Sequence, residues 1–370
     1  MPLTEDPAGW RRLIDAAELT RFVTEALHAA GARTSDAAVT AEVLVAADLG
    51  GVDSHGVARL RRYVEGLRNG DINRHAVPET VSDKGSVCVL DAHNGLGQPA
   101  LREAIDLAVS RAEQFGTSAV MVRRSNHMGI AGWFAERAAR AGMLAMVSTN
   151  AVPQVAPMGT NEPMFGTNPL CYAVPTTTSP LCFDGATSTV SRGKLEQLDR
   201  LGEPMLNGWA LGPDGQSTTD IPETVQGLIH RKGYALLPLG GGDKDHGGHK
   251  GSAMSLLIEL LCGPLAGAQW SRHTYQNGEG GLGHFVFCLN LNALGDADTI
   301  RAGVDELAQE VRSGTPTDRQ APVRIPGDRR RLVTEMRKEG GIPVLESVVT
   351  DLNDIAEFVG INPVAALTYV

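Results

Sequence analysis

Apolar residues recur at helical spacing along the first third of the chain. They predict helices over residues 13–30, 35–50 and 59–67, and Gly31 ends the first of these. The second helix runs into a pair of glycines, and a polar stretch at residues 53–56 separates it from the third. The N-terminal part is therefore expected to be helical, with one polar break.

The rest of the chain alternates between helical and extended patterns. A polar, Gly- and Pro-rich stretch at residues 203–233 predicts a long surface loop. The C-terminal part is expected to be helical, with a Pro-rich linker at residues 315–326. We expect further helices over residues 99–115, 129–140 and 251–261, and strands over residues 117–122, 143–149, 170–174, 181–183, 234–239 and 284–291.

Strands and helices are mixed throughout, which indicates the α/β or mixed α+β class. The strands are not followed by helices in a strict β-α-β rhythm, so a regular doubly wound sheet is not the automatic expectation. No strand-GxGxxG-helix pattern with a downstream acidic residue occurs. The Rossmann dinucleotide fingerprint is therefore absent.

Composition excludes several classes of protein. The chain has 370 residues, of which 42% are hydrophobic, which is enough for one large core or two smaller ones. Its net charge of −10 argues against general nucleic-acid binding, but a local basic pocket for a phosphate-bearing cofactor is compatible with it. The five cysteines form no CxxC pair, so we expect reduced, buried thiols in a cytoplasmic protein. No apolar run has the length of a membrane span, and the N-terminal segment has no apolar signal core.

A histidine and an arginine flank the break after the second predicted helix. His55 lies in Asp-Ser-His-Gly, and Arg59 would share a face with it if the next helix begins at this motif. A guanidinium can hold a carboxylate through two parallel hydrogen bonds, and an imidazole can pass a proton near neutral pH. Together they suit the reduction of a 2-oxo acid. Taken alone, His55 is equally well explained as a capping or solvent-facing histidine.

A second histidine, His127, lies in Ser-Asn-His-Met-Gly between an extended run and a helix. Loops at strand ends commonly hold catalytic groups, although a single loop histidine is weak evidence. Residues 148–169 follow, with many small hydrogen-bonding side chains on a backbone rich in Pro and Gly. This stretch could line a pocket for a nicotinamide carboxamide or a small polar substrate, or it could be an ordinary ordered loop.

A glycine-rich loop with two lysines precedes the helix predicted over residues 251–261. Free backbone N–H groups at a helix start, together with a lysine, suit a phosphate or a carboxylate. The order Gly-His-Lys-Gly at residues 248–251 is not that of a Walker A loop. A metal-dependent hydrolase is the competing hypothesis, but the potential ligands cannot all converge without a specific turn, and no second cluster completes a site. We therefore expect no metal at these positions, which are Asp243, Asp245, His246 and His249.

Seven short motifs, in this order, resemble those of the malate/L-lactate dehydrogenase family of type 2 oxidoreductases. The resemblance covers about residues 13–360. The motifs are Asp-Ser-His-Gly-Val-Ala-Arg at 53–59, Ser-Asn-His-Met-Gly at 125–129, Gly-Thr-Asn-Pro at 166–169, Asp-Gly-Ala-Thr-Ser at 184–188, Ser-Arg-Gly-Lys at 191–194, Gly-Gly-His-Lys-Gly at 247–251 and Ile-Pro-Gly at 325–327.

The resemblance implies an NAD- or NADP-dependent enzyme with a non-Rossmann fold and a largely antiparallel central sheet. It implies a helical domain at residues 1–80 plus 328–370 and a cofactor- and substrate-binding sheet domain at residues 81–327. The implied partners are a small 2-oxo or 2-hydroxy acid and a second copy of the chain in a homodimer, with no nucleic acid and no membrane.

The resemblance also implies roles for individual residues. His55 and His127 are the candidate proton-transfer residues, and Ser54 would support His55. Arg59, Thr167 and Asn168 are the expected substrate contacts. The expected cofactor contacts are Ser148, Asn150, Asp184, Gly185, Ala186, Thr187, Ser188, Lys194, His249, Lys250, Gly327, Asp328 and Arg329.

The expected function is reversible hydride transfer between a nicotinamide and a small 2-oxo or 2-hydroxy acid of the malate or lactate type. An alternative within the family is a reductase of cyclic imino acids such as piperideine- or pyrroline-2-carboxylate. An alternative from another class is a cofactor-binding protein without turnover. The sequence leaves open the particular acid, the choice between NAD and NADP, and which histidine moves the proton.

Overall fold

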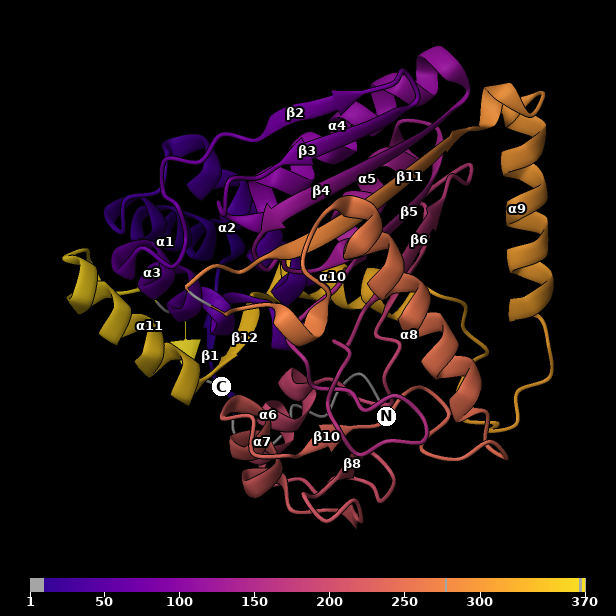
Figure 1. Ribbon diagram of the computed structural model, residues 1–370. Coiled ribbons are helices and arrows are strands. Elements are labelled where there is room, and N and C mark those ends of the chain that lie inside the picture. The colour runs from indigo at the N-terminus through magenta and orange to yellow at the C-terminus, as the bar shows by residue number, and fades with distance from the viewer. Residues whose placement is uncertain (1–9, 277, 366–367, 370) are drawn as a thin grey trace.

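The computed structural model describes residues 10–276, 278–365 and 368–369. Its main element is a seven-stranded sheet with the strand order β2-β3-β4-β11-β5-β6-β7 (Figure 1). β3 and β4 are parallel, and all other neighbours are antiparallel. The mixed class with a largely antiparallel sheet, expected from the sequence, is therefore confirmed. The strands are β2 (Glu79–Asp83), β3 (Val87–Asp91), β4 (Thr117–Ser125), β5 (Met143–Thr149), β6 (Leu170–Val174), β7 (Leu181–Gly185) and β11 (Leu282–Asn290).

The two faces of this sheet are covered differently. On one face, α4 (Gly97–Phe115) and α5 (Ala131–Arg140) bury alternate strand residues such as Val286 completely. The other face carries α8 (Gly248–Cys262), and a Cβ at Gly283, which points to that face, would overlap the C-terminal end of α8. Further along the strands the side chains on the α8 face are only half-buried.

The N-terminal helices and the last helix pack into one apolar core. A small antiparallel sheet, β12-β1-β13, lies beside them. Figure 1 shows the indigo N-terminal helices next to the yellow C-terminal helix. The domain boundaries at residues 80 and 328 stay a prediction. The elements are β1 (Trp10–Ile14), α1 (Ala16–Ala29), α2 (Thr34–Leu49), α3 (Leu60–Asn69), β12 (Ile342–Leu345), α11 (Glu346–Val359) and β13 (Thr368–Tyr369).

A third, smaller apolar cluster is built from the segment that links the sheet to α8. It contains α6 (Arg192–Leu201) and α7 (Ile221–Ile229). The prediction of a long surface loop at residues 203–233 is therefore wrong in part. Gly and Pro mark the turns there, but Asp220 caps α7, and its apolar residues fall at helical spacing. A small sheet completes this unit, formed by β8 (Ala210–Leu211), β9 (Ser217–Thr218) and β10 (Ala235–Leu236).

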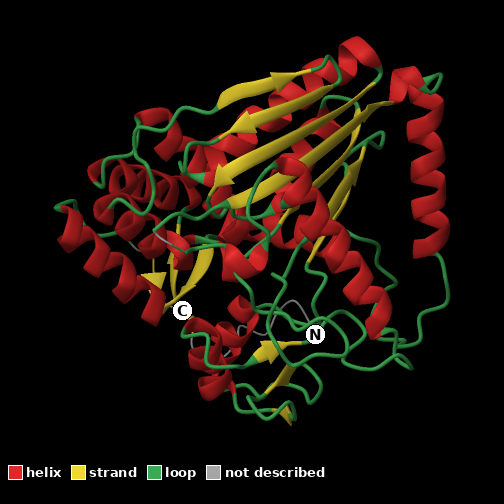
Figure 2. Ribbon diagram, viewed as in Figure 1, coloured by secondary structure: helices red, strands yellow, loops and turns green. Residues whose placement is uncertain are grey.

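Two helices complete the C-terminal part. α9 (Ala297–Arg312) lies at one side of the molecule, and α10 (Asp328–Gly340) contacts α2 and β12 (Figures 1 and 2). Within the described ranges, no helix combines the length and the apolar character needed to cross a bilayer.

Candidate active site

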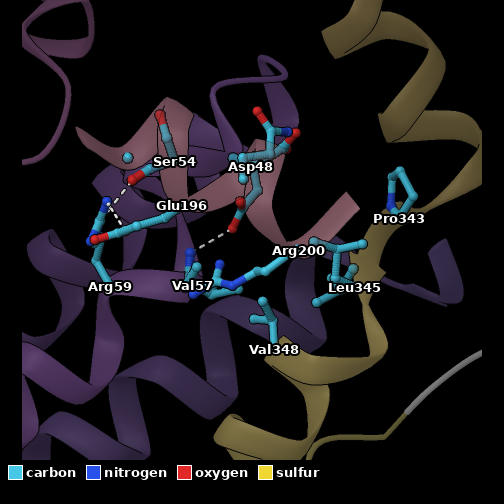
Figure 3. A pocket seen from close by; sticks show the side chains of 14 residues that line it. Asp48, Ser54, Val57, Arg59, Glu196, Arg200, Pro343, Leu345 and Val348 are labelled. Atoms are coloured by element: carbon cyan, nitrogen blue, oxygen red, sulfur yellow. Dashed lines mark hydrogen bonds and ion pairs between the residues drawn. The ribbon is translucent and has the colours of Figure 1, made fainter. Parts of the chain in front are cut away.

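Two short 3-10 turns, η1 (Asp53–His55) and η2 (Val57–Arg59), carry the histidine and the arginine of the first motif. The buried carboxylate of Asp48, at the end of α2, accepts a hydrogen bond from the backbone N–H of Val57 at 2.8 Å (Figure 3). A Cβ at Gly56 would lie 1.8 Å from Asp48 Oδ1, so only glycine fits between the two turns. Burial raises the pKa of Asp48 well above its usual value.

The fold brings the two predicted histidines together. The ring centroids of His55 and His127 lie 5.7 Å apart, and the ring planes differ by 20°. His127 follows the end of β4, and its loop is held by the amide of Asn126, which donates to the backbone oxygens of Asn94 and Gly95 at 3.0 Å. The sequence indicated each histidine separately, and the tertiary structure pairs them.

Hydrogen bonds define the neutral form of His127. Its Nδ1 accepts from the backbone N–H of Gly129 at 3.3 Å and lies 2.6 Å from the hydroxyl of Tyr63. Since a backbone N–H can only donate, Nδ1 is the acceptor, and the neutral ring carries its proton on Nε2. On His55, Nδ1 is hydrogen-bonded to Ser54 Oγ at 2.9 Å.

Both histidines are neutral near pH 7. Burial, with the charge of Arg59 as a second cause, lowers the pKa of His55 to about 4. Burial also lowers the pKa of His127 well below its usual value, and the charge of Arg62 is the second cause. A bound anion would oppose both shifts, because a nearby negative charge favours the imidazolium form.

A small polar cavity lies against the two histidines; we call it the substrate cavity. None of the residues that line it is acidic. The buried polar atoms in its wall include two neutral ones, Gln154 Nε2 and the hydroxyl oxygen of Tyr275, that have no hydrogen-bond partner among the described residues. The lining residues are His55, Arg59, Arg62, His127, Ala151, Val152, Gln154, Thr167, Ser191, Arg192, Gly193, Tyr275 and Leu282.

Glu196 of α6 lies behind this cavity and binds two of its arginines. Glu196 Oε2 lies 2.8 Å from Nη2 of Arg59, and Glu196 Oε1 lies 2.9 Å from Nε of Arg192. Arg59 also donates from Nε to the backbone oxygen of Ser54 at 2.7 Å (Figure 3). The arginine predicted from the first motif therefore borders the cavity with part of its charge already compensated.

A larger groove with a volume of about 420 Å³ adjoins the cavity and shares His55, Thr167 and Ser191 with it. Asp184 lines the groove and accepts from the backbone N–H of Gly132 at 2.7 Å, at the start of α5. Part of its side chain reaches the groove, yet the surrounding protein still raises its pKa to about 6 by desolvation. The remaining predicted cofactor contacts in this groove are Gly185, Ala186, Gly327 and Arg329.

Several of the other predicted contacts are buried behind these walls. The amide nitrogen of Asn168 donates to Glu259 at 2.7 Å, and the hydroxyl of Thr187 donates to the backbone oxygen of Asn168 at 3.0 Å. Ser148, Asn150 and Ser188 are likewise buried and line neither cavity nor groove.

Four predicted cofactor contacts lie elsewhere. Asp328 is bound to Arg312 at 2.8 Å, and Lys194 donates to Gln197 at 3.2 Å. His249 and Lys250 are exposed in the first turn of α8. None of these four lines the cavity or the groove.

The sequence analysis missed Arg62, Tyr63, Gln154 and Tyr275 as site residues. Arg62 and Tyr63 follow Arg59 by three and four residues, so helical spacing could have indicated them. Nothing local indicates Tyr275, whose backbone has an unusual positive φ of 52°.

The alternative metal cluster does not assemble. His246 Nδ1 and Asp243 Oδ1 lie 3.0 Å apart, and both side chains are exposed. Across residues 10–276, 278–365 and 368–369, no group of three or more His, Cys, Asp or Glu side chains is arranged to hold a metal ion.

The fold and the site define a class of α/β enzyme without the Rossmann fingerprint, in which a histidine pair lies where a small polar cavity meets a larger groove. The malate/L-lactate dehydrogenase family model matches residues 14–353, and the chain belongs to this family.

Individual relatives agree with this assignment. The chain is 38% identical to the malate dehydrogenase of Pyrococcus abyssi, over 93% of this chain and 94% of the relative. It is 33% identical to the (2R)-3-sulfolactate dehydrogenase (NADP(+)) of Chromohalobacter salexigens, over 93% and 98%. The crystal structure of malate dehydrogenase from Entamoeba histolytica superposes with a TM-score of 0.92 at 28% identity, over 95% of this chain and 99% of that one. The resemblance drawn from the motifs, and the oxidoreductase class with it, are confirmed.

Proposed function

We propose that the protein catalyses reversible hydride transfer between a nicotinamide cofactor and C2 of a small 2-oxo or 2-hydroxy acid. The observation that carries this proposal is the near-parallel pair of His55 and His127, 5.7 Å apart, where the substrate cavity meets the groove. Family membership and the malate and sulfolactate dehydrogenases among the relatives support it.

The groove contains an acceptor and donors that suit a nicotinamide dinucleotide. The carboxylate of Asp184 can accept from ribose hydroxyls, and the guanidinium groups of Arg329 and Arg330 can face phosphates. Arg330 is bound to Glu136, whereas Arg329 is exposed, which leaves Arg329 the better candidate to contact a 2′-phosphate. The cofactor is NAD or NADP, and when bound with its nicotinamide toward His55 it supplies or accepts the hydride.

The two histidines have different parts in this proposal. His127 carries its proton on Nε2 and donates a hydrogen bond to the substrate oxygen, which polarises the carbonyl. His55 moves the proton: in the tautomer that donates from Nδ1–H to Ser54 Oγ, its Nε2 is free to accept one. Arg59 orients the carboxylate of the acid. In oxidation, Nε2 of His55 takes the hydroxyl proton and the ring becomes an imidazolium. In reduction, His55 first takes up a proton from solvent and then passes it from Nε2 to the substrate oxygen.

A substrate panel tests the reaction class. NADH and NADPH oxidation are followed with pyruvate, oxaloacetate and pyrroline-2-carboxylate. Turnover of a 2-oxo acid is expected with at least one cofactor. Turnover of the imino acid alone would favour the alternative reductase, and no turnover with any of them would exclude the dehydrogenase.

Two variants test the division between the histidines. His55→Gln is expected to lower kcat by about 10²–10⁴-fold, the range typical of a lost general acid or base. His127→Gln keeps an N–H donor and should lose roughly tenfold. The opposite order would make His127 the proton-transfer residue.

We also propose that the protein is a cytoplasmic homodimer. All five cysteines are free and buried, which suits a reducing compartment. Met121, Met146, Phe285 and Phe287 form a half-buried apolar surface on the α8 face of the sheet. The adjoining exposed leucines of α8, which are Leu256, Leu257 and Leu260, extend it. We propose that a second copy of the chain buries this apolar surface in a dimer interface.

A further inference from the structure

The substrate cavity has an excess of positive charge. Three arginines, Arg59, Arg62 and Arg192, line it, and the only carboxylate bound to any of them in the described part of the chain is that of Glu196. Since both histidines are neutral, two positive charges remain uncompensated. One carboxylate of a bound acid would neutralise only one of them.

Among these three arginines, Arg62 alone forms no ion pair within the described part of the chain. Its guanidinium carbon lies 4.8 Å from the ring centroid of Tyr275, and no ion pair or hydrogen bond of this guanidinium is found among the described residues. Arg59 and Arg192 share Glu196 instead. An unpaired guanidinium stacked on an aromatic ring is held in place while its N–H donors stay free for an anion.

Acidic residues near Arg62 do not neutralise it. Arg62 also borders an outer cavity whose wall includes Glu65, Asp71 and Glu279. None of these carboxylates forms an ion pair with it, and Glu65 lies 3.5 Å from Arg61 instead.

Two neutral donors accompany Arg62 in the cavity wall. The Tyr275 hydroxyl and Gln154 Nε2 are buried there without hydrogen-bond partners in the described chain. Leaving such groups unpaired is costly, and an acidic group of a ligand would satisfy them. Charge and hydrogen-bonding capacity therefore indicate a second anion-binding position, beside the one at Arg59.

We propose that Arg62 binds a second acidic group of the substrate, so that the enzyme selects 2-oxo and 2-hydroxy acids that carry two negative charges over acids that carry one. This inference rests on the proposed function. The second group is a carboxylate or a sulfonate, and it takes no part in hydride or proton transfer. Lactate and a cyclic imino acid each lack it.

Selectivity between two substrates tests this assignment. We compare kcat/KM for oxaloacetate and pyruvate in the wild type, in Arg62→Gln and in a control, Arg68→Gln. Arg68 is on the same helix, but its guanidinium carbon lies 5.5 Å from the ring centroid of Phe358, outside the substrate cavity. All three proteins are assayed with the same cofactor at the same concentration.

The kcat/KM of the wild type should be about 100-fold higher for oxaloacetate than for pyruvate, and Arg62→Gln should lose most of this preference. A hydrogen bond between charged groups typically contributes a factor of this order. Arg62→Gln should lower kcat/KM for oxaloacetate far more than for pyruvate, and Arg68→Gln should behave as the wild type. Arg62→Lys should recover part of the preference. An equal loss for both substrates in Arg62→Gln, or a wild type that prefers pyruvate, overturns the proposal.

A binding measurement separates this inference from the proposed function. Succinate and butyrate have the same number of carbons but differ by one carboxylate. Neither has a hydroxyl group that the enzyme could oxidise, so both report binding alone. Calorimetry on the cofactor-loaded protein should show tighter binding of succinate, lost in Arg62→Gln only. If the wild type turns over no 2-oxo acid but still makes this distinction, the proposed function fails while Arg62 keeps its role. Turnover without the distinction overturns the role of Arg62.

Discussion

At the scale of single residues, the chemistry of the two histidines depends on their neighbours. The type of residue and its motif could be recognised in the sequence, but the form of His127 is defined by Gly129 and by Tyr63. The low pKa of both rings comes first from burial, which no short motif encodes. The same holds for Arg59, whose pairing with Glu196 appears only in the folded chain.

Removing the Tyr63 hydroxyl should slow the reaction without unfolding the protein. Tyr63→Phe deletes the 2.6 Å contact to His127 Nδ1 but keeps the buried ring. We expect kcat to fall about tenfold, because loss of one hydrogen bond corresponds to roughly 1–1.5 kcal/mol. Tyr234→Phe is the matched control, since that hydroxyl donates to Glu223 in α7. An unchanged kcat in Tyr63→Phe would show that the contact does not position His127.

At the scale of elements, the turn that carries His55 depends on one close approach. Gly56 fits between η1 and η2 because it has no Cβ, and Asp48 occupies the space that a side chain would need. The glycine was visible in the Asp-Ser-His-Gly motif, but its buried neighbour at the end of α2 was not.

Gly56→Ala should therefore displace the turn. The added methyl group would overlap Asp48 Oδ1, so we expect kcat/KM to fall by more than about 100-fold and the melting temperature to drop. In Gly303→Ala, the control, the new methyl group meets no neighbour within 4 Å in the middle of α9. That change should raise stability slightly, because Ala favours a helix over Gly. Equal effects of the two variants would contradict the steric explanation.

A third histidine joins three strands of the sheet. His284 of β11 is fully buried, with Nδ1 2.8 Å from Thr149 Oγ1 and Nε2 2.8 Å from Ser125 Oγ. Thr149 donates its hydroxyl hydrogen to the backbone oxygen of Gly283 or Asn150, so it accepts from Nδ1–H of His284. Burial lowers the pKa of His284 to about 3, and the ring stays neutral.

This histidine should make the fold sensitive to acid. The unfolded chain binds a proton at His284 below about pH 6.5, but the folded protein does not until about pH 3, so stability is full above pH 6.5 and decreases as the pH falls. Between pH 6.5 and 5.5, the free energy of unfolding of the wild type should decrease by about 1 kcal/mol more than that of His284→Gln. Urea unfolding at both pH values measures this difference. The exposed control His230→Gln should keep the wild-type dependence, and an identical slope in His284→Gln would refute the assignment.

At the scale of the whole molecule, the site lies where the N-terminal helices, the sheet and the α6 unit meet. The half-covered face of the sheet and the exposed leucines of α8 are features of the entire chain. They underlie the proposed homodimer.

Light scattering after size exclusion should give a mass of about twice the 39.1 kDa of one chain. Leu257→Glu adds a charge to the exposed apolar side of α8, where this leucine is 54% exposed, and should shift the protein toward the monomer. Val81→Glu adds the same charge on β2, at a residue that is 42% exposed, and should stay dimeric. A wild type that runs as a monomer would exclude the homodimer.

The sequence by itself determined the helical start of the chain, the mixed class without a Rossmann fingerprint, the family motifs and the two histidines. These follow from residue types and short spacings, which are local properties. Only the tertiary structure decided that His55 and His127 face one cavity, and that Asp184 and Arg329 line the groove while Asn168 and Thr187 lie behind its walls. It also decided that Arg59 is paired with Glu196 whereas Arg62 has no ion pair among the described residues. Ion pairs and burial depend on contacts between segments that are distant along the chain.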